Sequence, residues 1–456
     1  MRKILTLVLV VSSLSFGQKI HVPPVARFVL ENGLTIILME YKKVPLVHLR
    51  LVARGGSAQD PDGLEGAASM TTSLMREGTT NRTAPEIAEA IDLTGGSLTV
   101  ASGLDYCAAK AEVMAKDIDA GLDLFSDVIL NPVFPVEEIK RERKRRLAKL
   151  DALKEEPSSI ASITFSKTVY GSHPYGRQSF GTKASLELLK REHLVDFYRR
   201  TFLPNNSMLV AVGDFNSQEI LGKIKSVFDG WRLGARRDVS LPPPSLVRGR
   251  NIVLVNKADV TQTQIRVGNI GVDIRNPDYF PITVANTVFG GGFTSRLVEE
   301  LRVKRSLTYG ASSRFSRYMF GGVYSIDTFT KNKTITETIN VVLEELKKFR
   351  ERGPTKEEWQ KAQNYIAGSF ARSLQTPAAL AAEISDIELY GFPKDYLESY
   401  IENIRAVQLA DVQRVAHEYF PLDDLLLVLV TPAQETLPAI KQYGEVSILE
   451  LRDAIQ

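Results

Sequence analysis

One segment of the chain, GLEGAASMTTSLMREGT (63–79), has the spacing of a metal site without its side chains. The pattern predicts a helix over about 64–77. An H-x-x-E-H zinc site needs such a helix, with two imidazoles to hold the metal and a carboxylate to activate water on one face. That face here carries Gly66, Ser69, Met70 and Ser73, and the predicted core face carries Leu64, Ala67, Ala68, Leu74 and Met75. Glycine and methionine are not zinc ligands and serine is a poor base, so this face predicts no metal chemistry.

The rest of the sequence offers no replacement for that site. No two histidines are three to five residues apart, so no local pair of ligands exists. Each is expected to be a structural or surface residue; they are His21, His48, His173, His193 and His417. Cys107 lies in an alternating strand and is expected to be a small buried apolar residue. The sequence therefore predicts no metal site in this chain.

Composition is that of a packed globular protein and excludes one class of partner. Of the 456 residues, 44% are hydrophobic and 24% are charged. The net charge of +3 is too small to indicate nucleic acid. A single cysteine rules out an internal disulfide and leaves the compartment undecided.

The first residues resemble an export signal. Arg2 and Lys3 precede a short apolar run, and small residues follow it as far as Gly17. We interpret 1–17 as a signal peptide, which would leave no membrane span after cleavage and predicts an exported protein of the periplasm. A buried N-terminal strand is the alternative.

The order of predicted elements occurs twice. Each half has strands in hairpins, helices between them, one long helix, and then a Pro, a polar turn and a strand. The segment 233–250 contains Pro242-Pro243-Pro244 and is the best linker. We predict two homologous α+β domains, 18–232 and 251–456, each a mostly antiparallel sheet with helices packed on one face.

Several motifs in order resemble the pitrilysin family, the inverted zincins that include insulysin and the mitochondrial processing peptidases. They are Gly63-Leu64 and Gly78-Thr79 around the first helix, NGLTIILME, HPYGRQSFGT, FLPNNSMLVAVGDF and GGGFTSRLVEELRVKRSLTYGASS. The resemblance covers about 26–440 and implies half of a metallopeptidase clamshell. It places Gly66 and Met70 at the two histidine positions and Ser69 at the glutamate position. The third ligand, a glutamate of the later long helix, falls on Lys149.

The resemblance also implies two functional residues in the second half. The family carries an arginine and a tyrosine seven residues apart, which match Arg302 and Tyr309. The arginine would anchor a substrate backbone, and the tyrosine would donate a hydrogen bond to the oxyanion at the partner's zinc site. The alternative is a surface ion pair of Arg302 with Glu299 or Glu300 and a Tyr309 that caps the sheet.

A run of basic residues lies within the predicted long helix of the first half. Seven of the ten residues Lys140–Lys149 are Lys or Arg. Such runs are usually solvated helix faces. The alternatives are that positive charge fills the vacated metal site, or that the helix meets an acidic partner.

The sequence thus predicts the non-catalytic, Arg/Tyr-bearing subunit of a heterodimeric zinc peptidase. A homologous chain with an intact H-x-x-E-H motif would supply the zinc, peptide would be the substrate, and this chain alone would be inactive. A homodimer is left open. The alternative is an inert structural or peptide-binding scaffold of the same fold.

Overall fold

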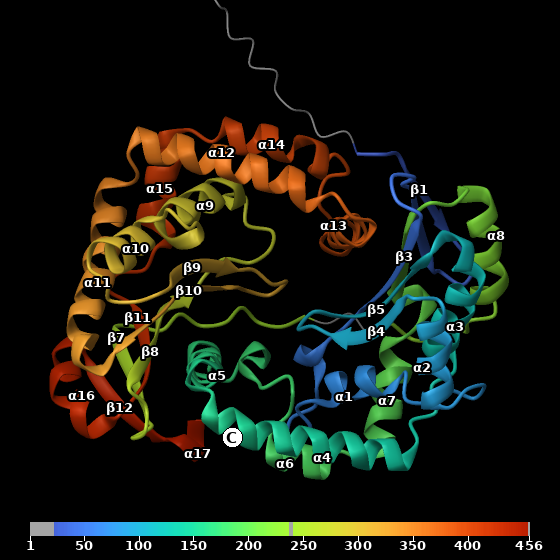
Figure 1. Ribbon diagram of the computed structural model, residues 1–456, viewed down its shortest axis with the longest axis horizontal. Helices are drawn as coiled ribbons and strands as arrows, with labels where there is room; N and C mark the ends of the chain where they lie inside the picture. Colours follow the sequence, from blue (N-terminus) through green and yellow to red (C-terminus); the bar gives the residue numbers. More distant parts are fainter. Residues whose placement is uncertain (1–21, 237–239, 455–456) are drawn as a thin grey trace, which may run out of the picture.

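The computed structural model describes residues 22–236 and 240–454. The predicted signal peptide, 1–17, lies outside the described residues. The described chain forms two six-stranded sheets with helices around them, one sheet on each side of the view in Figure 1. This confirms the predicted α+β class.

The first sheet has the strand order β1-β2-β6-β3-β5-β4. Its neighbours are antiparallel except for the parallel pair β2 and β6. A turn at Asn32-Gly33 joins the first two strands, with Gly33 at a φ of 83°, which glycine adopts without strain. The strands are β1 (Val25–Val29), β2 (Thr35–Glu40), β3 (Leu46–Arg54), β4 (Ser97–Ser102), β5 (Tyr106–Met114) and β6 (Ser207–Gly213).

The second sheet repeats this arrangement with the order β12-β7-β11-β8-β10-β9. The two sheets differ at one edge, where β1 is antiparallel to its neighbour and β12 is parallel to it. The other five strands of each sheet correspond one to one, as expected of a duplicated unit. The strands are β7 (Arg250–Asn256), β8 (Gln262–Ile270), β9 (Ala311–Ser316), β10 (Val323–Lys331), β11 (Leu425–Thr431) and β12 (Glu445–Glu450).

Helices surround both sheets (Figure 1). Those of the first half are α1 (Ala67–Leu74), α2 (Ala84–Leu93), α3 (Ile118–Leu130), α4 (Val136–Ala152), α5 (Pro157–Tyr170), α6 (Lys183–Leu188), α7 (Arg191–Thr201) and α8 (Ser217–Phe228). Those of the second half are α9 (Tyr279–Asn286), α10 (Arg296–Val298), α11 (Ile335–Arg352), α12 (Lys356–Ser373), α13 (Pro377–Tyr390), α14 (Tyr396–Ala406), α15 (Leu409–Tyr419), α16 (Ala433–Ile440) and α17 (Leu451–Ala454).

The two halves exchange one helix each. Helix α5 of the first half packs on β8 and β11, and α13 of the second half packs on β3 and β6. In the first contact Phe165 and Val169 lie against Leu426 and Val428. The second contact is an apolar cluster that joins Met39 and Val210 to Leu380 and Ile384, among others. Each sheet therefore has its own helices on one face and a borrowed helix on the other, which the sequence did not predict.

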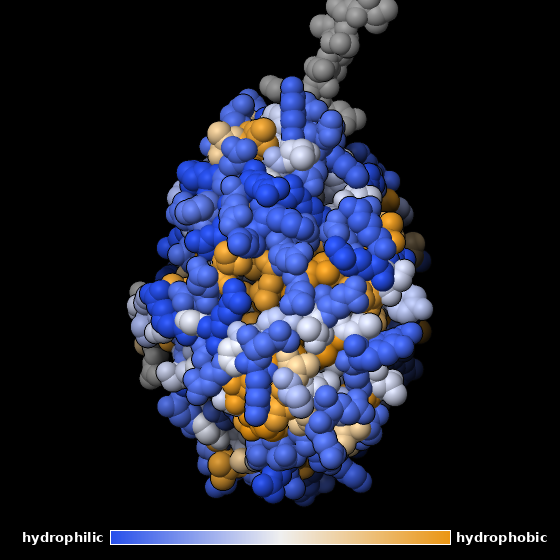
Figure 2. Space-filling view, turned by 90° about the vertical axis from the view of Figure 1, so that its left-hand side faces the viewer, coloured by the Kyte–Doolittle hydropathy of each residue, from blue (hydrophilic) through white to orange (hydrophobic). Residues whose placement is uncertain are grey.

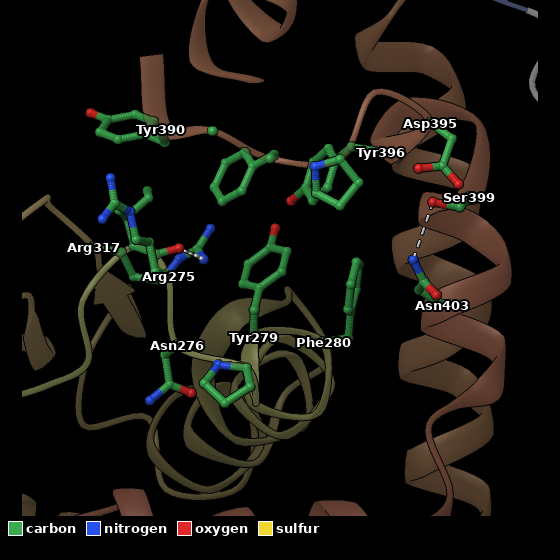
Figure 3. Close-up of a pocket in the computed structure, with 15 residues that line it drawn as sticks. Arg275, Asn276, Tyr279, Phe280, Arg317, Tyr390, Asp395, Tyr396, Ser399 and Asn403 are labelled. Carbon is green, nitrogen blue, oxygen red and sulfur yellow. Dashed lines mark hydrogen bonds between the residues drawn. The ribbon is translucent and has the colours of Figure 1, made fainter. Parts of the chain in front are cut away.

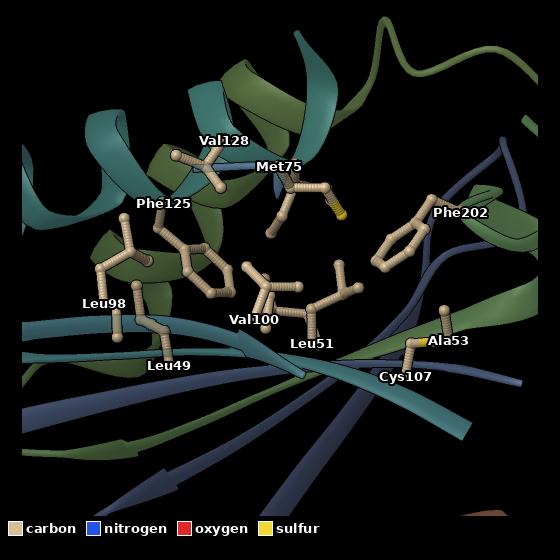
Figure 4. Packing of buried hydrophobic residues seen from close by; sticks show 14 of the residues in the cluster. Leu49, Leu51, Ala53, Met75, Leu98, Val100, Cys107, Phe125, Val128 and Phe202 are labelled. Carbon is tan, nitrogen blue, oxygen red and sulfur yellow. The ribbon is translucent and has the colours of Figure 1, made fainter. Parts of the chain in front are cut away.

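The largest core lies between the first sheet and its own helices. Figure 4 shows Leu49, Leu51 and Val100 of the sheet facing Phe125 and Met75 of the helices. Cys107 is fully buried in the same layer, as predicted. Burial raises the pKa of its thiol well above the ordinary value, so the group is an apolar packing element and not a nucleophile.

The outer helices give the second half a polar surface. Figure 2 views the side that carries α10, α11 and α16, which is mostly hydrophilic with apolar groups near its centre. In the described part of the chain, no helix combines the length and the apolar character needed to cross a membrane.

Candidate functional site

The helix that resembles a metal-binding helix begins later than predicted. It starts at Ala67, and Gly66 is its N-cap with a φ of 93°. A Cβ atom at Gly66 would lie 2.9 Å from the Cα and N of Gly181. A histidine at 66 would therefore require the backbone of both segments to move.

Met70 belongs to the core and not to the polar face. Its side chain is 0% exposed and lies in the cluster beneath the helix. The prediction that it lies with Ser69 on the face opposite the core was wrong. Helix α1 packs against α4, α7 and β4, so its apolar face is wider than one sheet would require.

The side chain of α4 that reaches the polar residues of α1 is Arg146. Its Nη1 donates to Ser69 Oγ at 2.7 Å, and its Nη2 donates to the Ser69 carbonyl at 2.9 Å and to Ser73 Oγ at 3.1 Å. The sequence-based placement of Lys149 at this position was wrong. Lys149 is three residues further along α4, exposed, with its Nζ 4.8 Å from the Phe180 ring centroid.

The guanidinium of Arg146 is held in a buried ion pair. Its Nε donates to Glu142 Oε1 at 2.6 Å, and both side chains are at most 6% exposed. Burial alone would raise the pKa of Glu142, but Arg146 and Arg145 lower it below the ordinary value. One positive charge of the basic run thus lies in the vacated site, as one interpretation of that run predicted. Three others of the run, Lys140, Arg141 and Arg145, pair with acids three residues away on the same helix.

These residues do not fit zinc. The positions carry no imidazole, thiolate or carboxylate aimed at a shared point, and a permanent cation lies among them. Within residues 22–236 and 240–454, no group of three or more His, Cys, Asp or Glu is placed to hold a metal ion.

Asp60 fixes the start of α1. Its two carboxylate oxygens accept hydrogen bonds from the N–H groups of Gly66 and Ala68, each at 2.8 Å. Acceptors at this position satisfy N–H groups that have no partner within the helix. Burial raises the pKa of Asp60 to about 7, although both N–H groups lower it.

Arg302 lies in a π-helical segment of the second half. The segment, Glu299–Lys304, follows a second π-helical segment at Thr287–Gly291. Such local widenings occur frequently at functional sites. Gly290 is required here, since a Cβ atom would lie 2.4 Å from Ser313 Oγ.

The two predicted residues of this half differ in exposure, since Arg302 is half-buried and Tyr309 is exposed. The Arg302 guanidinium lies 4.9 Å from the ring centroid of Phe293, and Tyr309 is 81% exposed just before β9. The alternative ion pair is absent among the described residues, because Glu300 binds Lys304 at 2.6 Å and Arg305 at 3.5 Å instead. Arg302 and the vacated metal position lie in different halves of the chain.

A bidentate ion pair anchors the segment that carries Arg302. Arg296 donates to both carboxylate oxygens of Glu358 in α12, at 2.7 and 2.6 Å. Burial would raise the pKa of Glu358, but the bonds from Arg296 and Thr355 lower it. The anchor holds α10 on α12, and Leu297, Val298 and Leu301 after it are buried in the core of this half.

Comparison with known proteins places most of the chain in one family. Residues 36–183 match the model "Insulinase (Peptidase family M16)", and residues 189–366 match "Peptidase M16 inactive domain". An uncharacterized zinc protease of Streptomyces coelicolor is 25% identical over 401 residues, 86% of this chain and 87% of its own. The uncharacterized zinc protease YmxG of Bacillus subtilis is 23% identical, over 90% of this chain and 98% of its own.

Solved structures share the fold over nearly the same range. The peptidase M16 inactive domain from Pseudomonas fluorescens superposes with a TM-score of 0.84 at 24% identity, covering 90% of this chain and 98% of that one. A protease from Helicobacter pylori gives a TM-score of 0.83 at 20% identity, covering 90% and 100%. The two sheets and their helices therefore form a fold that is already known from solved structures.

Proposed function

Because this chain belongs to peptidase family M16, we propose that it is the non-catalytic subunit of a heterodimeric zinc peptidase of that family. The zinc, its ligands and the general base come from a homologous partner with an intact H-x-x-E-H motif. This chain contributes half of the chamber wall and the pair Arg302 and Tyr309. The chain alone has no peptidase activity.

The observation that carries the proposal is the position of Arg146. The Arg146 guanidinium donates to Ser69 of α1 and forms an ion pair with Glu142 of α4. The polar groups of both helices are therefore already engaged. In the second half, by contrast, the side chains of Tyr309 and Phe293 are both exposed. Loss of one site together with exposure of the other supports division of labour between two chains.

Two sheet edges are suited to an extended peptide. The strands β4 and β9 lie at corresponding edges of the two sheets. An edge strand offers unpaired N–H and C=O groups to which a peptide adds as a further strand. Arg302 would hold the peptide backbone with its planar donors, and the Tyr309 hydroxyl would donate to the developing oxyanion.

The test is zinc content and peptide hydrolysis, measured on the purified chain alone and on a mixture with a candidate partner. The candidate is a chain of similar length that has an intact H-x-x-E-H motif and is encoded by a neighbouring reading frame. We expect neither zinc nor activity alone and activity on mixing. Stoichiometric zinc with chelator-sensitive activity from this chain alone would refute the proposal. Inactivity of every mixture would instead favour an inert scaffold.

A further inference from the structure

A cavity of about 640 Å³ lies in the second half, apart from Arg302 and Tyr309. It is bounded by the start of α9, the turn between β9 and β10, and the turn between α13 and α14 (Figure 3). Its volume is within the range of small-molecule pockets. None of the sequence motifs predicted it, because its walls come from three separated segments.

Aromatic rings line most of the cavity. Tyr279 and Phe280 of α9 have ring centroids 5.0 Å apart, and Phe392 and Tyr396 stack across from them at 4.9 Å. The Tyr279 hydroxyl is 3.1 Å from the Tyr400 hydroxyl, and this hydrogen bond fixes the orientation of the Tyr279 ring. The result is an apolar slot with rigid faces, suited to a flat or branched apolar side chain.

Two arginines close one end of the cavity. Figure 3 shows Arg275 and Arg317 together on the side away from Asp395. Arg317 stacks with its guanidinium carbon 3.6 Å from the Tyr279 ring centroid and donates one hydrogen bond, from Nη1 to the Ile274 carbonyl at 3.3 Å. Among the described residues, neither arginine has an ion pair with a carboxylate. The stack on Tyr279 orients a planar donor fork whose other N–H groups remain for an anion.

We propose that this cavity binds the C-terminal carboxylate of a peptide whose last residue is apolar or aromatic. The carboxylate lies between Arg275 and Arg317, and the last side chain lies among the rings of Tyr279, Phe280 and Tyr396. Asp395 lines the cavity away from the arginines, so an acidic last residue is disfavoured. The proposal deepens the proposed function, since cleavage creates such peptide ends, but the binding itself requires neither partner nor zinc.

The experiment measures fluorescence anisotropy of a labelled peptide on the full chain alone. The probe is a hexapeptide with fluorescein at its N-terminus and phenylalanine with a free carboxylate at its end. The same peptide with a C-terminal amide is the matched ligand control. We expect the acid to bind at least ten-fold more tightly than the amide, because a charge-assisted bidentate contact is lost in the amide.

Variants test the two arginines. Arg317→Gln and Arg275→Gln should each weaken binding of the acid about ten-fold and leave binding of the amide unchanged. Arg352→Gln makes the same charge change on an exposed arginine of α11 and should bind like wild type. Arg275 is itself exposed, so its replacement tests the site even where Arg317→Gln perturbs the local fold.

Three results would overturn the inference. They are no binding of the acid, equal binding of acid and amide, and equal behaviour of Arg317→Gln, Arg275→Gln and Arg352→Gln. Competition by free phenylalanine as strong as that by the unlabelled hexapeptide would overturn the assignment to a peptide end in favour of a free amino acid. Because no cleavage is measured, failure here leaves the two-chain peptidase proposal to its own test.

Discussion

Arg50 and Arg266 occupy the same register position in the two sheets. Arg50 of β3 lies opposite Val210 of β6, and Arg266 of β8 lies opposite Val428 of β11. Each side chain is buried and reaches a serine of the helix borrowed from the other half. Arg50 Nε donates to Ser385 Oγ of α13 at 3.1 Å, and Arg266 Nη2 donates to Ser158 Oγ of α5 at 2.8 Å. The exchange of helices therefore has a polar bond at equivalent points of both halves.

Arg266→Met should lower the free energy of unfolding by about 3 kcal/mol. It removes the 2.8 Å ion pair with Asp327, a carboxylate only 14% exposed, and the bond to Ser158. Arg50→Met should cost less, about 1–2 kcal/mol, because Arg50 donates to the neutral hydroxyls of Ser385 and Tyr106. Urea unfolding measures both. A loss for Arg266→Met no greater than for Arg352→Met on the surface would contradict the prediction.

Arg146→Met should also destabilise the protein by about 3 kcal/mol, because it leaves the buried charge of Glu142 with only the exposed Arg145 as its ion-pair partner. Lys149→Met, on the exposed face of the same helix, is the control and should change stability little. The double variant Glu142→Gln/Arg146→Met should be more stable than Arg146→Met alone, since no buried charge remains. Thermal unfolding of the three proteins checks the order, and equal melting of Arg146→Met and Lys149→Met would disprove it.

The raised pKa of Asp60 predicts that the free energy of unfolding falls as pH rises. The pKa of this carboxyl is raised to about 7 in the folded chain and is about 3.9 in an unfolded one. The stabilisation is therefore complete below pH 4 and is lost as pH rises to about 7, by at most about 4 kcal/mol. Asp60→Asn removes this titration. Relative to wild type it should gain stability between pH 4 and pH 7, and parallel pH profiles of the two melting temperatures would exclude the assignment.

Arg302→Ala and Tyr309→Phe should each slow peptide cleavage by the reconstituted pair and leave its assembly intact. We expect about a hundred-fold loss for Tyr309→Phe, the size seen when one oxyanion donor is removed. Arg302→Ala should cost about ten-fold. Arg305→Ala is the control, because Arg305 is a neighbouring arginine paired with Glu300. Unchanged rates in both variants, with assembly confirmed by size-exclusion chromatography, would remove the roles assigned to this pair.

The elements that could be predicted are those with one apolar face. The hairpin at Asn32-Gly33 and the helices α2, α4 and α11 follow from turn residues and from apolar spacing, and the structure has them. Helices α5 and α13 were not predicted, although each begins with a proline at its first position. Both helices pack between the sheet of the other half and further parts of the chain, so their apolar residues do not form a single stripe.

The candidate site was predictable in what it lacks and not in what fills it. The absence of ligands at 66, 69 and 70 follows from the sequence alone. That Arg146 and not Lys149 reaches Ser69 depends on where α4 crosses α1, and residue counting does not give a crossing point. The left-handed start of α1 at Gly66 depends equally on the close approach of Gly181.

The exchange of α5 and α13 limits how far the two halves are independent. A half produced by itself would have a bare apolar sheet face, with Val210 exposed in one case and Val428 in the other. It would be prone to aggregate, yet the two fragments made together should recognise each other without a peptide bond between α8 and β7. The segment that joins α8 to β7 would then not be needed to hold the two halves together. Duplication has produced one cooperative unit that happens to be encoded in a single polypeptide, and a split version of it should still assemble.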